Sequence, residues 1–286
     1  MRTFNEVLMN LSSLMVHLTA SESKDALLRF AVDLASRLKA TRVVGISACQ
    51  PLAIYGSPDA YVPQDLVTWD LEFIEKELKE AEKSFRAVVE GKVTDCQWRS
   101  TVISYGTIAD YVAQQMRAAD LLVVAIQEPA SLFERHRVNL ADLAIRAGKP
   151  VLVVGRGVDK LDAKSVVVGW KDTREARRAA EDALPVLKLA ERVTVVQVAA
   201  KDDLDDARAG TADVAAWLSG HGISATARAV VATADDSTEL EAIAKELDAG
   251  LLIGGAYGHS RLREWVLGGV TRDLLLRPAR CSFVSH

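Results

Sequence analysis

Hydrophobic and polar positions in the second part of the chain follow two alternating patterns. Short apolar runs rich in β-branched residues alternate with longer stretches in which Ala and Leu recur at helical spacing. The runs predict strands at 166–170, 193–198, 225–231, 251–253 and 281–284, and the stretches predict helices at 173–189, 205–218, 238–247 and 270–276. Five short strands separated by helices predict a mainly parallel, doubly wound sheet.

The first part of the chain repeats this order. Strands are predicted at 14–18, 42–47, 98–103, 121–126 and 151–154, and helices at 25–38, 71–89, 108–116 and 140–147. The segments AADLLVVA and RAGKPVLVVG parallel the later segments DAGLLIGG and RPARCSFVSH. We therefore predict two tandem domains, 1–157 and 164–286, which meet at a charged joint around residues 156–164. A polar insertion between Pro51 and Asp70 either covers a site or forms a plain surface loop.

The last strand of each predicted sheet would be an unpaired edge. Pairing 151–154 with 281–284 would close both edges inside one chain. We therefore expect an intramolecular pseudo-dimer, and the sequence leaves a further homodimer open.

Composition and charge narrow the class of protein. Of the 286 residues, 49% are apolar and 26% are charged, which is typical of a globular chain. The net charge of −4 and the scattered basic residues do not favour a nucleic-acid partner. Apolar runs are far shorter than the roughly 20 residues of a membrane span, and residues 1–11 lack the pattern of a secretion signal. We expect a cytoplasmic protein with no membrane partner.

Cysteine and histidine positions predict neither a metal site nor catalysis. Cys49, Cys96 and Cys281 are widely spaced in apolar surroundings, so we interpret them as reduced core or strand residues. None of the five histidines pairs with another ligand in the manner of H-E-x-x-H, and Walker and G-x-S-x-G motifs are absent. We expect no enzyme, or at most weak ATP hydrolysis. The acids near the glycine-rich stretch described next are Asp172, Asp235 and Asp236, the last two also being typical of a helix start.

A glycine-rich stretch, GGAYGHSRLREWVLGGVTRDLLL, follows the predicted strand 251–253. Its Gly255, Gly258 and Gly268 are separated by two and then nine residues. Glycines let a backbone approach a ligand closely, and a helix that starts near Gly269 or Val270 would offer N–H groups to an anion. Phosphate is the expected ligand, and the alternative is a tight strand-to-helix connection.

This Gly-x2-Gly-x9-Gly loop, followed by VTRDLL and a final apolar strand, resembles the universal stress protein family. The resemblance implies flavodoxin-like open sheets, dimers or tandem pseudo-dimers joined through their last strands, and ATP or another nucleotide bound by some members. It also implies a role as a stress-response sensor or regulator, with protein partners and with or without Mg²⁺. Gly255, Gly258 and Gly268 match the phosphate and ribose loop, and Val270 and Thr271 follow it.

Several positions depart from that pattern or have two interpretations. Gly269 stands where many nucleotide-binding members have Ser or Thr, and Lys171 stands where the family usually has an Asp that accepts a hydrogen bond. Lysine only donates, although it can reach a phosphate. Trp170 would stack on a base or fill the pocket, and His259 would contact a phosphate or face solvent.

The corresponding loop of the first half contains no glycine between Ala125 and Gly148. Pro129 and Phe133 stand where the backbone would need to approach a ligand. We therefore expect a degenerate first half and a nucleotide in the second half. The alternative is a scaffold that binds no nucleotide and acts through protein partners.

Overall fold

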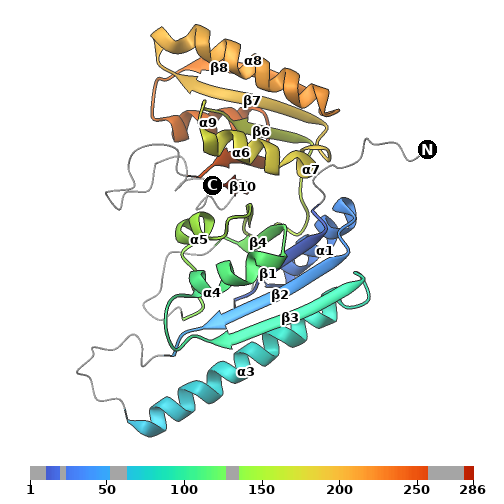
Figure 1. Cartoon of the computed structure of the whole chain (residues 1–286), viewed down its shortest axis with the longest axis vertical. Helices are drawn as coiled ribbons and strands as arrows, with labels where there is room; N and C mark the ends of the chain where they lie inside the picture. The colour runs from blue at the N-terminus through green and yellow to red at the C-terminus, as the bar shows by residue number, and fades with distance from the viewer. Residues whose placement is uncertain (1–10, 20–23, 52–62, 127–134, 257–279) are drawn as a thin grey trace.

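The computed structural model describes residues 11–19, 24–51, 63–126, 135–256 and 280–286, and its strands form one ten-stranded sheet (Figure 1). The strands are β1 (Ser13–His17), β2 (Arg42–Cys49), β3 (Asp95–Val102), β4 (Leu121–Ala125), β5 (Val151–Val154), β6 (Ser165–Gly169), β7 (Arg192–Ala199), β8 (Ala225–Val231), β9 (Leu251–Gly255) and β10 (Cys281–Ser285). The α-helices are α1 (Lys24–Leu38), α3 (Gln64–Val89), α4 (Ile108–Gln115), α5 (Leu140–Arg146), α6 (Arg174–Asp182), α7 (Leu184–Leu187), α8 (Leu204–Gly220) and α9 (Asp236–Glu246).

The sheet consists of two five-stranded halves joined edge to edge. Its order is β3-β2-β1-β4-β5-β10-β9-β6-β7-β8. The β5–β10 pair is antiparallel, with Phe283 opposite Leu152, whereas the other pairs in the sheet are parallel. The predicted closure of both sheet edges inside one chain is confirmed. The predicted fold class is confirmed as well: two tandem flavodoxin-like halves, each doubly wound and mainly parallel, form a pseudo-dimer.

Hydrophobic residues cover both faces of this sheet, and each core continues from one half into the other. One core packs α1, α3, α6, α7 and α8 on the sheet, and the other packs α4, α5 and α9. Phe283 belongs to the first core and its neighbour Val284 to the second, because successive strand residues point to opposite faces. Burial on both faces explains why inner strands such as β4 and β5 read as continuous apolar runs. Cys49 and Cys281 are buried, Cys96 is half-buried, and all three are free thiols, as predicted.

Two predicted helices differ from the structure. α3 begins at Gln64 and not at residue 71, because Pro63 is accepted just before the first turn, so the insertion is shorter than expected. The predicted helix 173–189 is divided into α6 and α7 at Ala183. Pro185 lacks an N–H, and its ring would clash with the carbonyl four residues earlier, which ends α6.

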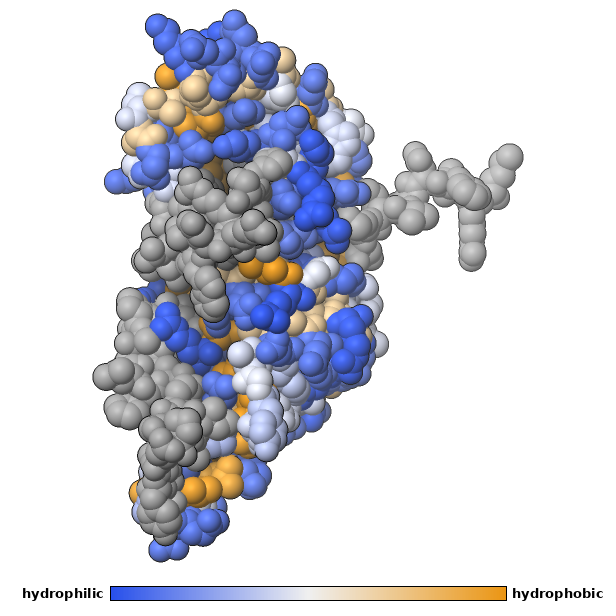
Figure 2. Space-filling model, turned by 60° about the vertical axis from the view of Figure 1, so that its left-hand side comes forward, coloured by the Kyte–Doolittle hydropathy of each residue, from blue (hydrophilic) through white to orange (hydrophobic). Residues whose placement is uncertain are grey.

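The described part of the surface in Figure 2 is mostly hydrophilic, with hydrophobic side chains at the lower end, where α3 begins in Figure 1. The exposed large apolar residues of this region are Leu66, Trp69, Leu71 and Phe73. The rings of Trp69 and Phe73 stack with centroids 5.7 Å apart. None of the described helices combines the length and the apolar character that a bilayer span requires.

Candidate functional site

Strand order defines one candidate site in each half. In the first half the chain reverses its direction of winding between β1 and β4, and in the second half it does so between β6 and β9. Ligands of doubly wound sheets bind beyond the carboxyl ends of the strands at such a switch point. These two positions are therefore the places to compare.

The switch point of the second half brings together the described residues of the predicted site. Trp170 and Lys171 directly follow β6, and Gly255 ends β9. β6 and β9 are parallel neighbours, with Val168 opposite Ile253, so both chain ends emerge at the same edge. The other predicted residues lie outside the described part of the chain; they are Gly258, His259, Gly268, Gly269, Val270 and Thr271.

Gly255 has a packing role at this position. A Cβ atom there would lie 2.5 Å from the carbonyl carbon of Glu175 and 2.6 Å from the backbone nitrogen of Ala176. The absence of a side chain therefore allows the first turn of α6 to pack directly against the end of β9. Thr173 caps this helix, its hydroxyl accepting from the backbone N–H of Ala176 at 3.2 Å.

Glu175 is a site residue that sequence reasoning missed. Its side chain is 11% exposed, beside the end of β9, and its carboxylate lies 3.2 Å from Arg174. A carboxylate in the first turn is stabilised by the helix dipole. The sequence signal was present, since Thr173 is followed two residues later by an acid. This negative charge would oppose a phosphate group placed close to α6.

Trp170 is half-buried and packs against the core on the face covered by α6 and α8. Its backbone N–H donates to the carbonyl of Val196 at 2.7 Å, which extends the β6–β7 ladder by one residue. A Cβ at Gly210 of α8 would lie 3.8 Å from the indole nitrogen. The described contacts of Trp170 are therefore those of a packing residue.

The charged residues after β6 are paired. The Lys171 amine lies 3.8 Å from the carboxylate of Asp236, and Arg177 donates to Asp172 at 2.9 Å. Asp235 is the N-cap of α9, and hydrogen bonds from Ser237 and then Thr238 hold the pKa of its carboxyl far below the usual range. The structure thus supports the helix-start interpretation of Asp235.

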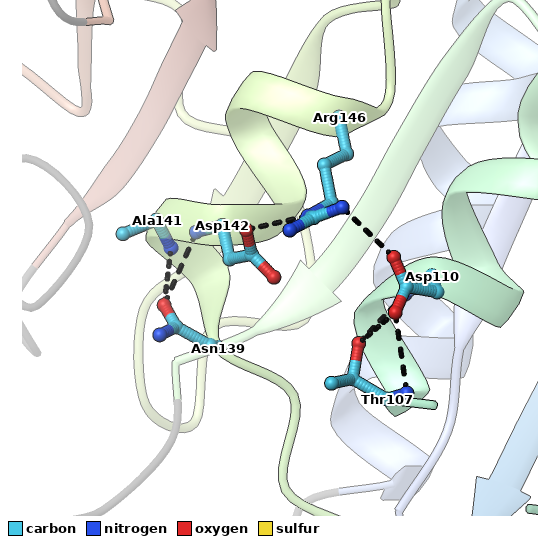
Figure 3. Close-up of polar contacts among 6 residues, drawn as sticks. All are labelled: Thr107, Asp110, Asn139, Ala141, Asp142 and Arg146. Carbon is cyan, nitrogen blue, oxygen red and sulfur yellow. Dashed lines mark hydrogen bonds and ion pairs between the residues drawn. The ribbon is translucent and has the colours of Figure 1, made fainter. Parts of the chain in front are cut away.

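In the first half, α5 is the counterpart of the helix that the sequence predicts near Gly269 in the second half. Side chains of the chain itself bind the N-terminus of α5 (Figure 3). Asn139 caps α5, and its side-chain oxygen accepts from the backbone N–H groups of Ala141 and Asp142, each at 3.1 Å. Arg146 ties this turn to α4 by contacting Asp142 at 2.6 Å and Asp110 at 3.0 Å. Two of the N–H groups that would bind an anion are therefore already satisfied.

His17 ends β1 at the same switch point. It is 1% exposed, and in the described part of the chain neither ring nitrogen has a hydrogen-bond partner. Burial, and secondarily the charge of His136, lowers the pKa of His17 to about 4. A neutral, buried imidazole fills the place where the second half has Gly169.

Comparison with solved structures supports the architecture. A universal stress protein from Archaeoglobus fulgidus covers 96% of this chain over 98% of its own length, with a TM-score of 0.69 and 15% identity. A functionally unknown protein from Pseudomonas aeruginosa PAO1 covers 96% over 92%, with a TM-score of 0.57 and 14% identity. A Pseudomonas aeruginosa UCBPP-PA14 protein provisionally assigned to the universal stress proteins covers 96% over 93%, with a TM-score of 0.58 and 15% identity.

No protein-family model matches the sequence, and no curated protein matches it. The structural neighbours nevertheless extend over both halves of the chain and share its sheet-and-helix arrangement. The chain therefore has the tandem, two-domain fold of the universal stress proteins.

Proposed function

We propose that this chain is a stress-response regulator of the universal stress type that binds ATP or a related nucleotide in its second half. One observation carries the proposal. The switch point between β6 and β9 brings the start of the glycine-rich segment, at Gly255, beside Trp170 and Lys171. A doubly wound sheet offers its ligand site at this position.

The local chemistry suits a phosphate on one side of this position. The glycine-rich sequence after Gly255 would supply backbone N–H groups for an anion, and the exposed Lys171 amine supplies a positive charge within reach of Asp236. The negative charge of Glu175 would disfavour a phosphate close to α6. The phosphates would therefore lie toward the glycine-rich segment. The carboxylates of Asp172 and Asp236, which pair with Arg177 and Lys171, would be the partners of a hydrated Mg²⁺.

A nucleotide at this position has a short route to the junction between the halves. α6 packs on β9 and β10, and the Ser285 hydroxyl of β10 donates to Asp182 of α6. β10 in turn pairs with β5 of the first half. Ligand contacts that shift α6 would act directly on this junction, which is the basis for a sensing role.

Calorimetric titration of the full chain with ATP, ADP and AMP, with and without Mg²⁺, tests the proposal, together with mass spectrometry of any ligand that co-purifies. We expect Gly258→Val and Gly268→Val to abolish binding. Lys171→Ala should weaken it about three- to tenfold, the loss of one charge-assisted contact worth about 1 kcal/mol. Gly220→Val is the matched control, because a Cβ at Gly220 meets open space.

A scaffold that binds no nucleotide is the second candidate, and two observations favour it. Lys171 is already paired with Asp236, and the largely buried Glu175 carboxylate belongs to the first turn of α6, which packs against Gly255. The exposed side chains Leu66, Trp69, Leu71 and Phe73 would then belong to a partner surface. Absence of heat at sub-millimolar nucleotide and absence of a co-purified ligand would select this candidate over the first.

A further inference from the structure

Three side chains that can ligate a metal meet at the end of β2 in the first half. Cys49 is the last residue of β2, Glu77 lies on α3, and His136 lies in the segment before α5. The Cys49 sulfur, a Glu77 carboxylate oxygen and a His136 ring nitrogen all lie within 4.8 Å of one another. Ligand atoms of a tetrahedral zinc ion are about 3.6 Å apart. Small side-chain movements would therefore bring all three atoms to a common ion.

The hydrogen-bond geometry of His136 requires a proton or a cation between its outer nitrogen and Glu77. Nδ1 lies 3.2 Å from the carbonyl oxygen of Ala48, which can only accept, so Nδ1 carries the hydrogen. Nε2 lies 2.9 Å from a carboxylate oxygen of Glu77, which also only accepts. Two electron pairs face each other unless a proton or a cation lies between them. An imidazolium supplies the proton, and a divalent metal supplies the cation.

The contacts around His136 fix it as a metal-bound histidine requires. The backbone N–H of Gln50 donates to the carbonyl of Arg135 at 2.9 Å, which ties the segment to the end of β2. The Arg135 guanidinium forms an ion pair with the nearly buried Asp70 and lies 5.4 Å from the ring centroid of Phe73. Metal-bound histidines commonly donate their other N–H to a backbone carbonyl, as His136 does to Ala48.

The charges of the cluster match a divalent ion. Asp70 and Arg135 neutralise each other, which leaves the Glu77 carboxylate and the Cys49 sulfur. Direct coordination ionises a thiol, and the resulting thiolate and carboxylate would together balance a charge of two.

We propose that Cys49, Glu77 and His136 form a site for one Zn²⁺ ion in the first half of the chain. Sulfur, nitrogen and carboxylate oxygen form a donor set that suits zinc and disfavours Mg²⁺ or Ca²⁺. The Glu77 and His136 side chains are 22% and 11% exposed, so solvent reaches the cluster. Three protein ligands leave a fourth position for water or another small ligand. This inference departs from the expectation, based on sequence spacing, that the chain has no metal site.

Titration of the metal-stripped full chain with CoCl₂, followed by absorption spectroscopy, tests the proposal. We expect one equivalent of Co²⁺ to give a thiolate-to-cobalt charge-transfer band and the visible bands of four-coordinate cobalt, all removed by one equivalent of ZnCl₂. Cys49→Ser should lose the charge-transfer band, and Cys96→Ser, the matched control on β3, should keep it. Glu77→Gln and His136→Gln should each weaken Co²⁺ binding at least tenfold.

Two results would overturn the proposal. One is the absence of a charge-transfer band in the natural chain, in which case a proton joins His136 to Glu77. The other is a band that persists in Cys49→Ser, which would place the cobalt elsewhere. Circular dichroism checks that each variant folds. If Cys49→Ser does not fold, unchanged cobalt affinity in both Glu77→Gln and His136→Gln would also overturn the proposal.

Discussion

The two switch points have the same strand order, but different residues lie at them. In the first half, Asn139 caps α5 with its own side chain, and buried His17 ends β1. In the second half, Gly169 and Gly255 end the two central strands, and α6 packs against the second of them. Asn139 and Gly269 each lie twelve positions before the first residue of the following strand. A repeated fold thus preserves the backbone edge, whereas the described side chains at that edge differ between the halves.

The largest expected effect comes from separating the two halves. Fragments 1–157 and 164–286 each expose an apolar edge strand, β5 or β10, and interrupt both cores. We expect each fragment alone to dimerise or aggregate, and a mixture to form a one-to-one complex, as judged by size-exclusion chromatography with light scattering. Two well-behaved monomers would contradict a shared core.

His17 should make the free energy of unfolding depend on pH. Gly169, at the equivalent strand end of the second half, has no side chain to titrate. The unfolded chain binds a proton at this residue below a pKa of 6.5, but the folded chain binds it only below about 4. Neutral His17 therefore contributes roughly 3 kcal/mol to the free energy of unfolding above pH 6.5, and this contribution is lost as the pH falls toward 4.

Urea unfolding at pH 7.5 and pH 4.5 measures this loss. We expect His17→Leu to lose distinctly less stability than the natural chain between these two values. Met15→Leu, a neighbour on the same strand and face, should keep the natural pH dependence. Equal losses in the His17→Leu variant and the natural chain would show that His17 is protonated without cost in the folded state.

Gly255→Ala should destabilise the second half by about 1–3 kcal/mol, because the new Cβ would overlap the first turn of α6. Gly220→Ala at the end of α8 meets open space and should be neutral or stabilising by about 0.5–1 kcal/mol. Thermal or urea unfolding compares the two variants. A neutral Gly255→Ala would show that α6 can move away from β9 without cost.

The smallest effect is expected at the capped helix end of the first half. Asn139→Ala removes two hydrogen bonds to the first turn of α5 and should cost about 1 kcal/mol. Gln114→Ala, at an exposed position of α4, is the control and should be near neutral. Unfolding midpoints give the comparison, and equal values for both variants would mean that water replaces the Asn139 cap.

The sequence alone determined the order of the described elements and the joining of the halves, whereas the predicted helix 270–276 lies outside the described residues. Strands buried on both faces produce apolar runs, and helices between them produce a different period, so both are visible locally. The pairing of 151–154 with 281–284 followed from the physical need to cover an edge. The full extent of α3 was missed, because prolines before residue 64 are equally typical of a loop and of a helix start.

Only the tertiary structure decided which side chains meet. Cys49, Glu77 and His136 come from a strand, a helix and a loop, and no spacing in the sequence relates them. The contact between Gly255 and Glu175 could not be predicted from sequence spacing either, because the sheet brings together segments far apart in the chain. Local patterns record how each element is buried, whereas such contacts depend on how the sheet places the ends of several elements at one edge.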